Sequence, residues 1–370
     1  MTRIIHFFRR QPINFLLLAA PIAILASADH WGEIWVFVAS SLAIIPIARY
    51  IGAATEALAH YTGPRVGALL NATLGNAAEL IITIFAIQAG LLDLVKASIT
   101  GSILGNLLLV LGMAMLLGGI KNGLQRFQRE PAMRNAVLLA LSVITLLIPS
   151  ILSSSIGPSG SLKVEILSLG VATVMIVLYA LTLIYSFSTQ NGSLTTQIGE
   201  TELVEAGILV EENTRPPWSV RTALVVLILA TIGVAVMSEL LVGAVEPIVI
   251  QFGITEFFLG IILIPIIGNA AEHLVAVTVA IRNKMDLSVE ISVSSSLQIA
   301  LFVAPLLVFI SLLMGHPLTL VFNQFEWLAL IAGVMIAALV SFDGESNWLE
   351  GAELLAIYLI LALAFFLLPA

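Results

Sequence analysis

The sequence contains no cysteine and few charged residues. Without cysteine the chain has no disulfide framework, no thiol nucleophile and no thiolate metal site. Only 10% of the 370 residues are charged, whereas a soluble domain carries about a quarter. The basic residues number 15 and the net charge is −8, so nucleic acid is excluded as an expected partner.

Apolar residues dominate instead: they make up 59% of the chain, and the mean hydropathy is +1.09. About 20 apolar residues cross a bilayer as a helix, so this composition predicts an all-α membrane protein with many spans. Barrel strands are excluded, because their polar and apolar residues alternate and these runs do not. The first run is interpreted as a span, not as a signal peptide. We expect eleven transmembrane helices, near residues 13–28, 34–59, 64–90, 95–118, 133–152, 163–187, 218–243, 255–281, 287–314, 325–341 and 348–369.

Lysine and arginine are distributed unequally between the two sides that these spans define. The side of the N-terminus collects twelve of them: Arg3, Arg9, Arg10, Arg65, Lys121, Arg126, Arg129, Arg134, Arg215, Arg221, Arg282 and Lys284. The other side has Lys96 and Lys163, and Arg49 falls within a span, where it could snorkel or pair with an acid. Cytoplasmic loops carry the excess of basic residues, so the N-terminus is predicted to be cytoplasmic.

One connection, residues 188–217, is polar and rich in glutamate. We interpret it as a solvated cytoplasmic linker with a possible short acidic helix over 199–212, and a cation-collecting or regulatory surface is the alternative. The linker divides the chain into parts. The expected parts are an extra N-terminal helix (1–33), a first five-helix repeat (34–187), the linker (188–217) and a second five-helix repeat (218–370).

An internal repeat supports this division. "GNAAEL" begins at Gly75 and "GNAAEH" begins at Gly268, an offset of 193 residues. At the same offset Ser102 corresponds to Ser295, and each serine follows its glutamate by 23 residues. The first motif lies in the third span and the second in the eighth, so the two halves have opposite topology. Inverted repeats are typical of secondary transporters, whose substrate site lies at the repeat interface.

The repeated glutamates, Glu79 and Glu272, are the central candidates. An ionisable side chain in the hydrocarbon costs at least about 2.5 kcal/mol on insertion scales, so a symmetric pair needs a function. Two neighbouring buried carboxylates compete to ionise, and such a pair binds a proton readily. The pair also suits a hard divalent cation with oxygen ligands. Proton and cation then exclude each other, which is the chemistry of an antiporter.

The residues around the two glutamates could complete such a site. Gly75 and Gly268 could break their helices and expose backbone carbonyls, and Pro265 favours a break in the second motif. Asn76 and Asn269 lie on the same helix face as their glutamates, and could ligate a cation, orient a carboxylate, or merely bridge helices. Neutral oxygens are also available from Ser102, Ser295 and Gln298, although serines often only allow close packing.

Other polar residues have less defined roles. Glu56, Glu239 and Glu246 occupy the first spans of the two halves, where they could line access pathways or lie at the membrane surface. His273 adjoins Glu272 and could be structural or relay protons. No zinc-binding histidine pair or HExxH motif occurs, so neither a zinc cage nor an intramembrane enzyme is expected.

The paired motifs, the eleven spans and the acidic stretch between spans six and seven resemble the cation/proton exchanger family of the calcium/cation antiporter superfamily. The resemblance implies exchange of cytoplasmic Ca²⁺ for protons by alternating access, with no cofactor. It makes Glu79 and Glu272 the carriers of both ions. The surrounding residues would be Asn76, Asn269, Ser102, Ser295, Gln298 and the backbone near Gly75 and Gly268, with Glu56, Glu239 and Glu246 along the entry routes.

Alternatives remain at this point. They are a sodium-coupled calcium exchanger, an antiporter for another divalent ion such as Mn²⁺, and a cation channel, although channels usually repeat in parallel around a pore. Serine and glutamine in the ninth span favour proton coupling over sodium coupling within the resemblance. The short loops favour the bacterial inner membrane. Oligomeric state is not predicted.

Overall fold

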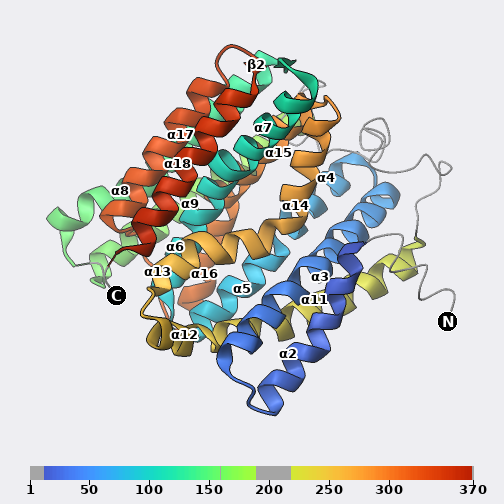
Figure 1. Ribbon diagram of the computed structural model, residues 1–370. Coiled ribbons are helices and arrows are strands. Elements are labelled where there is room, and N and C mark those ends of the chain that lie inside the picture. The colour runs from blue at the N-terminus through green and yellow to red at the C-terminus, as the bar shows by residue number, and fades with distance from the viewer. Residues whose placement is uncertain (1–11, 159, 189–217, 369–370) are drawn as a thin grey trace, which may run out of the picture.

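The computed structural model describes residues 12–158, 160–188 and 218–368, which form helices and one small two-stranded sheet (Figure 1). The first half consists of η1 (Pro12–Leu18), α2 (Ala19–Ala28), α3 (Glu33–Thr62), α4 (Pro64–Leu74), α5 (Ala77–Gln88), α6 (Leu92–Leu104), η2 (Gly105–Val110), α7 (Leu111–Asn122), β1 (Gln125–Arg126), α8 (Arg129–Ile156) and α9 (Leu162–Ser188). The second half consists of α11 (Val220–Gly243), α12 (Val245–Phe252), α13 (Glu256–Phe258), η3 (Leu259–Leu263), α14 (Ile264–Ile281), α15 (Met285–Gln298), η4 (Ile299–Val303), α16 (Ala304–Leu313), α17 (Gln324–Val340), β2 (Glu345–Ser346) and α18 (Trp348–Phe366).

These helices confirm the predicted class, an all-α membrane protein. Within the described ranges, eight helical stretches are long and apolar enough to cross a bilayer. Three shorter apolar helices accompany them, at Pro12–Ala28, Ala77–Gln88 and Gln324–Val340. Large apolar side chains such as Ile184 and Ile360 are exposed on the helix surfaces, where hydrocarbon would contact them. The acidic linker and the helix expected at 199–212 fall in residues 189–217, outside the described residues.

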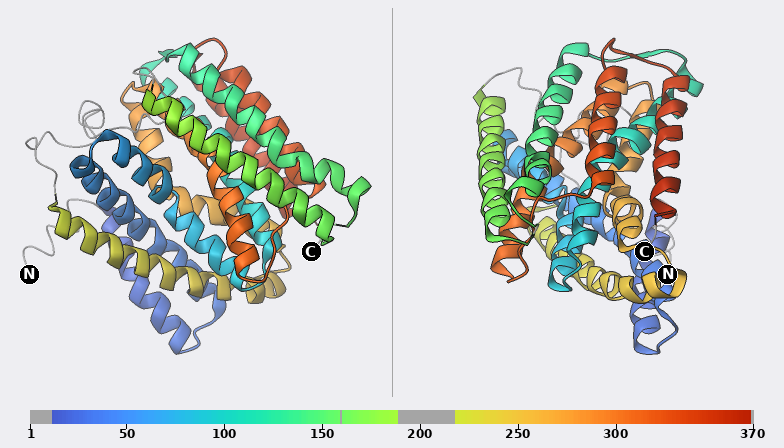
Figure 2. Two further views of the ribbon diagram at one scale, coloured as in Figure 1. Left: turned by 180° about the vertical axis from the view of Figure 1, so that it is seen from behind. Right: turned by 90° about the vertical axis from the view of Figure 1, so that its left-hand side faces the viewer.

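The helices form two groups with the motif helices between them (Figure 2). One group contains α2, α3 and α11, and α3 packs along both partners. The other group contains α8, α9, α17 and α18, among which α8 contacts α9 and α17. The motif helices α5 and α14 lie between the groups, since α5 contacts α11 and α14 contacts both α3 and α7. The repeated motifs are therefore at the centre of the molecule.

Three π-helical turns interrupt the central helices. They are η2 after α6, η3 before α14 and η4 after α15. Such turns are rare in proteins, and those that occur often lie near functional sites. Two of them occupy matching places in the two halves, because η2 begins three residues after Ser102 and η4 begins four residues after Ser295.

The C-terminal end of α14 is fixed to the first half of the chain. The Gln125 side chain donates to the carbonyl oxygen of Ala280 over 2.9 Å, and Asn122 donates to that of Ile281 over 3.1 Å. Both are late carbonyls of a helix, which have no partner within the helix itself. The same connection contains β1, which pairs antiparallel with β2, and this pairing links it to α18.

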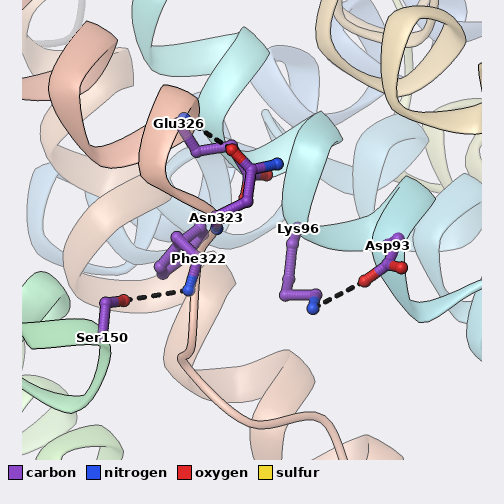
Figure 3. A network of polar contacts seen from close by, with 6 residues as sticks. All are labelled: Asp93, Lys96, Ser150, Phe322, Asn323 and Glu326. Atoms are coloured by element: carbon purple, nitrogen blue, oxygen red, sulfur yellow. Dashed lines mark hydrogen bonds and ion pairs between the residues drawn. The ribbon is translucent and has the colours of Figure 1, made fainter. Parts of the chain in front are cut away.

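Residues 316–323 have no regular structure, and alternate side chains of this segment are buried. Leu318, Leu320 and Phe322 are buried there, so their backbone groups need partners within the protein. Serine hydroxyls from three helices supply them: Leu318 N–H donates to Ser311, Leu320 N–H to Ser168 and Phe322 N–H to Ser150. Figure 3 shows the last of these contacts, next to the start of α17.

Candidate functional site

Glu79 lies in the first turn of α5, just after a break in the helix. The predicted break at the first motif is present: α4 ends at Leu74, Gly75 and Asn76 form a turn, and α5 begins at Ala77. A helix N-terminus has unsatisfied N–H groups and a partial positive charge, which favours a carboxylate in the first turn. The break therefore gives Glu79 an electrostatic environment that an unbroken helix would lack.

Donors from two neighbouring helices surround this carboxylate. Ser102 on α6 and the side-chain amide of Asn269 on α14 both donate to Oε1 of Glu79 through short hydrogen bonds. The Glu79 side chain is only 3% exposed, and its Oε2 is buried without a hydrogen-bond partner among the described residues. One oxygen is thus doubly satisfied by the protein, and the other is available to a proton or a cation.

Glu272 has a more open environment in the middle of α14. Its Oε2 accepts a hydrogen bond of 2.7 Å from Ser295 on α15, and the residue is half-buried. Ser102 and Ser295 therefore play matching roles, each donating to the glutamate that precedes it by 23 residues. The predicted correspondence of the two serines holds in three dimensions.

The two asparagines do not behave alike. Asn269 reaches across the repeats to Glu79, whereas the side-chain amide of Asn76 donates to Oε1 of Gln298 over 2.9 Å. Oδ1 of Asn76 is buried and has no partner among the described residues. Glu79 therefore receives an asparagine donor, Asn269, from the opposite repeat. By symmetry Asn76 would donate to Glu272, but it donates to Gln298 instead.

The motif glycines face the glutamate of the opposite repeat. A Cβ placed on Gly268 would lie 2.8 Å from Cγ of Glu79, closer than carbon atoms pack. A Cβ placed on Gly75 would lie 3.5 Å from Oε1 of Glu272. The absence of side chains at these positions brings the two motifs into one site.

The predicted helix break at Gly268 is wrong. The helix α14 runs from Ile264 to Ile281 through the glycine, and Pro265 lies directly after the π-helical turn η3, within the continuous helical stretch Glu256–Ile281. The irregular backbone lies earlier, in the π-helical turn η3. Gly268 is needed for space beside Glu79, and this does not require a break.

The remaining candidates lie outside this arrangement. Glu56 is half-buried on α3, and Glu239 on α11 and Glu246 in the first turn of α12 are exposed. Their place on access pathways stays a prediction. The ring Nε2 of His273 lies 3.2 Å from Oδ1 of Asn106, a buried residue of η2 that sequence reasoning missed. The signal that could have found Asn106 is its place in an apolar run after Leu-Gly, which repeats the Leu-Gly-Asn triplet that ends at Asn76.

The site offers only oxygen atoms and amide or hydroxyl groups. Two carboxylates share a buried region with three side-chain donors and with unpartnered oxygens of Glu79 and Asn76. An uncompensated charge is costly in such a place, so each carboxylate needs a proton or a cation. Calcium prefers six to eight oxygen ligands, including carboxylates and amide carbonyls. The arrangement can therefore hold either protons or a hard divalent cation.

Known proteins resemble the chain over nearly its whole length. The family model described as "sodium/calcium exchanger protein" matches residues 32–188 and 222–367. A protein of Aphanothece halophytica named "Ca(2+)/H(+) antiporter" is 47% identical over 359 residues, which cover 96% of each chain. A Bacillus subtilis protein named "Ca(2+)/H(+) antiporter ChaA" is 44% identical over 96% of this chain and 99% of its own. The solved structure of native YfkE aligns with a TM-score of 0.81 at 40% identity, covering 96% of this chain and all of its own.

Proposed function

This chain belongs to the sodium/calcium exchanger protein family, and from that premise we propose that it exchanges Ca²⁺ for H⁺ across a membrane. The antiporter names of its relatives, at 44–47% identity over nearly the full length, support this function. Their names describe transporters, so the chain is a transporter and not an enzyme. Ca²⁺ and H⁺ are its substrates, and the lipid bilayer is its environment.

Glu79 and Glu272 are the proposed carriers of both ions. The observation that supports this role best is the close approach of the two motifs, in which Gly268 leaves room for Glu79 and Gly75 lies beside Glu272. Ca²⁺ neutralises both carboxylates, and two protons can do the same. An empty, doubly charged site would carry uncompensated buried charge across the membrane, so that state is disfavoured and exchange is coupled. Ser102, Ser295, Asn269, Asn76 and Gln298 position these groups and add oxygens.

The site is open on one side in this conformation. Gly75 is exposed and Glu272 is half-buried, whereas Glu79 is 3% exposed. We propose that this opening faces the side on which α4 begins, which is the cytoplasmic side in the topology that the lysine and arginine distribution predicts. This conformation is thus the one that takes up cytoplasmic Ca²⁺. Sliding of α3 and α11 against the motif helices would close it and open the other side.

The membrane topology is a further part of the proposal. We propose eleven spans, with repeats over 34–187 and 218–370 and an extra helix in 1–33, a cytoplasmic N-terminus, and a location in a bacterial inner membrane. The matching π-helical turns η2 and η4 support the repeat. Because the chain has no cysteine, single cysteines introduced at Lys121 and Lys163 report sidedness by impermeant thiol labelling. Labelling of both from the same side would contradict the topology.

The test of transport is ⁴⁵Ca²⁺ uptake into proteoliposomes driven by a pH step. We expect uptake by the wild type, none by Glu79→Gln or Glu272→Gln, and normal uptake by the control Glu33→Gln, which alters an exposed carboxylate. Normal transport by Glu79→Gln would refute the carrier role. A Na⁺ gradient that replaces the pH step would identify a sodium-coupled exchanger, and competition by Mn²⁺ would measure selectivity.

A further inference from the structure

Glu326 is a buried carboxylate outside the transport site, in the first turn of α17 (Figure 3). It belongs to a capping box: the Glu326 N–H donates to the side chain of Asn323 over 2.9 Å, and Oε2 of Glu326 accepts from the Asn323 N–H over 2.6 Å. The residue is 2% exposed, and its Oε1 has no hydrogen-bond partner among the described residues. Helix capping accounts for the hydrogen bond of Oε2, but it does not account for the burial of Oε1 without a partner.

A second capping box in the same chain shows that burial is not part of the motif. In α18, Oε2 of Glu350 accepts from the Asn347 N–H over 3.2 Å, and Glu350 is only half-buried. A glutamate at this helix position can therefore remain near solvent. The burial of Glu326 is a property of its surroundings.

The start of α6 lies beside Glu326. Leu104 of α6 packs against Gly333 of α17, where an added Cβ would lie 2.6 Å from Cδ2 of the leucine. Lys96 precedes Leu104 by eight residues and Glu326 precedes Gly333 by seven, so at about 1.5 Å per residue the two lie at nearly the same depth. Lys96 and Asp93 are the charged residues that act electrostatically on Glu326.

Lys96, the basic residue that acts on Glu326, forms its ion pair with another carboxylate. Nζ of Lys96 lies 2.6 Å from Oδ1 of Asp93, whose side chain is 77% exposed, whereas the lysine side chain is 18% exposed. Figure 3 shows the lysine directed toward Asp93 and away from α17. An ion pair with an exposed partner contributes little, about 0–1 kcal/mol, so this contact is easily exchanged.

No other described element that packs against α17 brings a compensating charge to this end. The charged residues of α8 lie in its first two turns, and Arg129 contacts the ring of Phe342, beyond the opposite end of α17. The turn η2 contains no charged residue. Asp93 itself acts electrostatically on a further carboxylate, Glu256, on which Glu246 also acts. A charged Glu326 would thus be a buried anion without a full counter-charge, since only the N-terminus of α17 and the Asn323 N–H act on it directly.

We propose that Glu326 is a proton-binding site separate from the transport site, neutral in this conformation, and that Lys96 is the counter-ion of its charged form. An uncompensated buried carboxylate is far less stable than a protonated one. When the proton leaves, the flexible lysine side chain turns from Asp93 to the free Oε1 of Glu326. The exchange replaces a weak exposed ion pair by one between α6 and α17.

The exchange affects the transport site through α6. Ser102, which donates to Glu79, follows Lys96 by six residues on this helix. A bond from Lys96 to α17 holds α6 and thereby restrains the donor of the buried carrier. Proton concentration on the side of Asp93 then sets the transport rate independently of the transported protons, a consequence that rests on the proposed function.

Isotope-edited infrared spectroscopy of the purified full chain tests the site without transport. Subtraction of the Glu326→Gln spectrum from that of the wild type isolates the protonated carboxyl band of Glu326. Glutamine can replace glutamate in a capping box, so this variant keeps the helix start. Glu350→Gln, the matched change in the other box, should leave the band in place.

Lys96→Met gives the second infrared result. Without its counter-ion the charged form of Glu326 is less stable, so the band should persist to higher pH than in the wild type. The proposal is overturned if Glu326→Gln removes no titrating band, or if Lys96→Met leaves the titration midpoint unchanged.

Transport in proteoliposomes tests the effect on rate. The pH on the side of Asp93 is varied while the pH difference across the membrane is held constant. The wild-type rate should include a component that changes by up to about tenfold per pH unit, the limit for one titrating group, and Glu326→Gln should lack it. Glu326→Gln should keep the wild-type number of protons per Ca²⁺, and the double variant with Lys96→Met should match it. An unchanged pH profile would refute the effect on rate, whereas absence of uptake by the wild type would refute only the proposed function.

Discussion

Replacing Gly268 by alanine tests the close approach of the two motifs. The new Cβ would lie 2.8 Å from Cγ of Glu79, whereas carbon atoms pack at about 3.5–4.0 Å, so one group must move by roughly 1 Å. Glu79 cannot retreat freely, because Ser102 and Asn269 hold its carboxylate and the side chain is buried. Overpacking of this kind costs about 1–3 kcal/mol, and a cost of this size borne by the Ca²⁺-bound state corresponds to a loss of Ca²⁺ affinity of about 5- to 160-fold.

The assay for Gly268→Ala is the Ca²⁺ dependence of ⁴⁵Ca²⁺ uptake, measured beside thermal unfolding in detergent. Gly170→Ala on α9 is the matched control, since nothing lies within 4 Å of a Cβ at that position. We expect a raised KM for Gly268→Ala and an unchanged KM for Gly170→Ala. The same KM in both variants would show that Gly268 does not set the spacing to Glu79.

Three further predictions concern the contacts around the site. Ser102→Ala removes a donor to the buried carboxylate of α5, and should weaken Ca²⁺ affinity by about 1.5–3 kcal/mol, measured as KM; an unchanged KM would contradict the contact. Asn76→Ala and Gln298→Ala should be non-additive in a double-mutant cycle of KM, with a coupling of about 0.5–3 kcal/mol, because the two side chains bond to each other; strict additivity would exclude this bond in the functional state. Gln125→Ala should lower the unfolding temperature, because the Gln125 amide no longer donates to the Ala280 carbonyl or to Asn283, at a cost of about 0.5–1.5 kcal/mol for each bond; the Asn283 N–H still donates to Ala280, and a stability equal to the wild type would show that the anchor is dispensable.

The helices and the central position of the two motif glutamates could be predicted from the sequence because their signals are local. Hydrocarbon contact requires long apolar runs, and these runs mark the helices directly. Glu79 and Glu272 stand out because charged residues are rare in such runs. The break at Gly75 was also predictable, since a Gly-Asn pair readily leaves the helical conformation.

The pairing within the site could not be predicted, because it depends on contacts between distant segments. Helical spacing places each asparagine beside its own glutamate, yet Asn269 bonds to Glu79 of the other repeat. Gly268 looked like a helix breaker, and its actual role is set by a side chain 189 positions earlier, that of Glu79. The capping pattern of Asn323 and Glu326 is visible in the sequence, but the burial of Glu326 is not.

Under the proposed function, the unequal surroundings of Glu79 and Glu272 impose an order on ion exchange. Glu79 is enclosed by donors from α6 and α14, whereas Glu272 faces the open side with a single donor from α15. An arriving cation must meet Glu272 first and settle on Glu79 last, and a departing one on this side must reverse that sequence. Although the two motifs are nearly identical in sequence, their surroundings differ, so the binding and the release of a cation each proceed through two different steps.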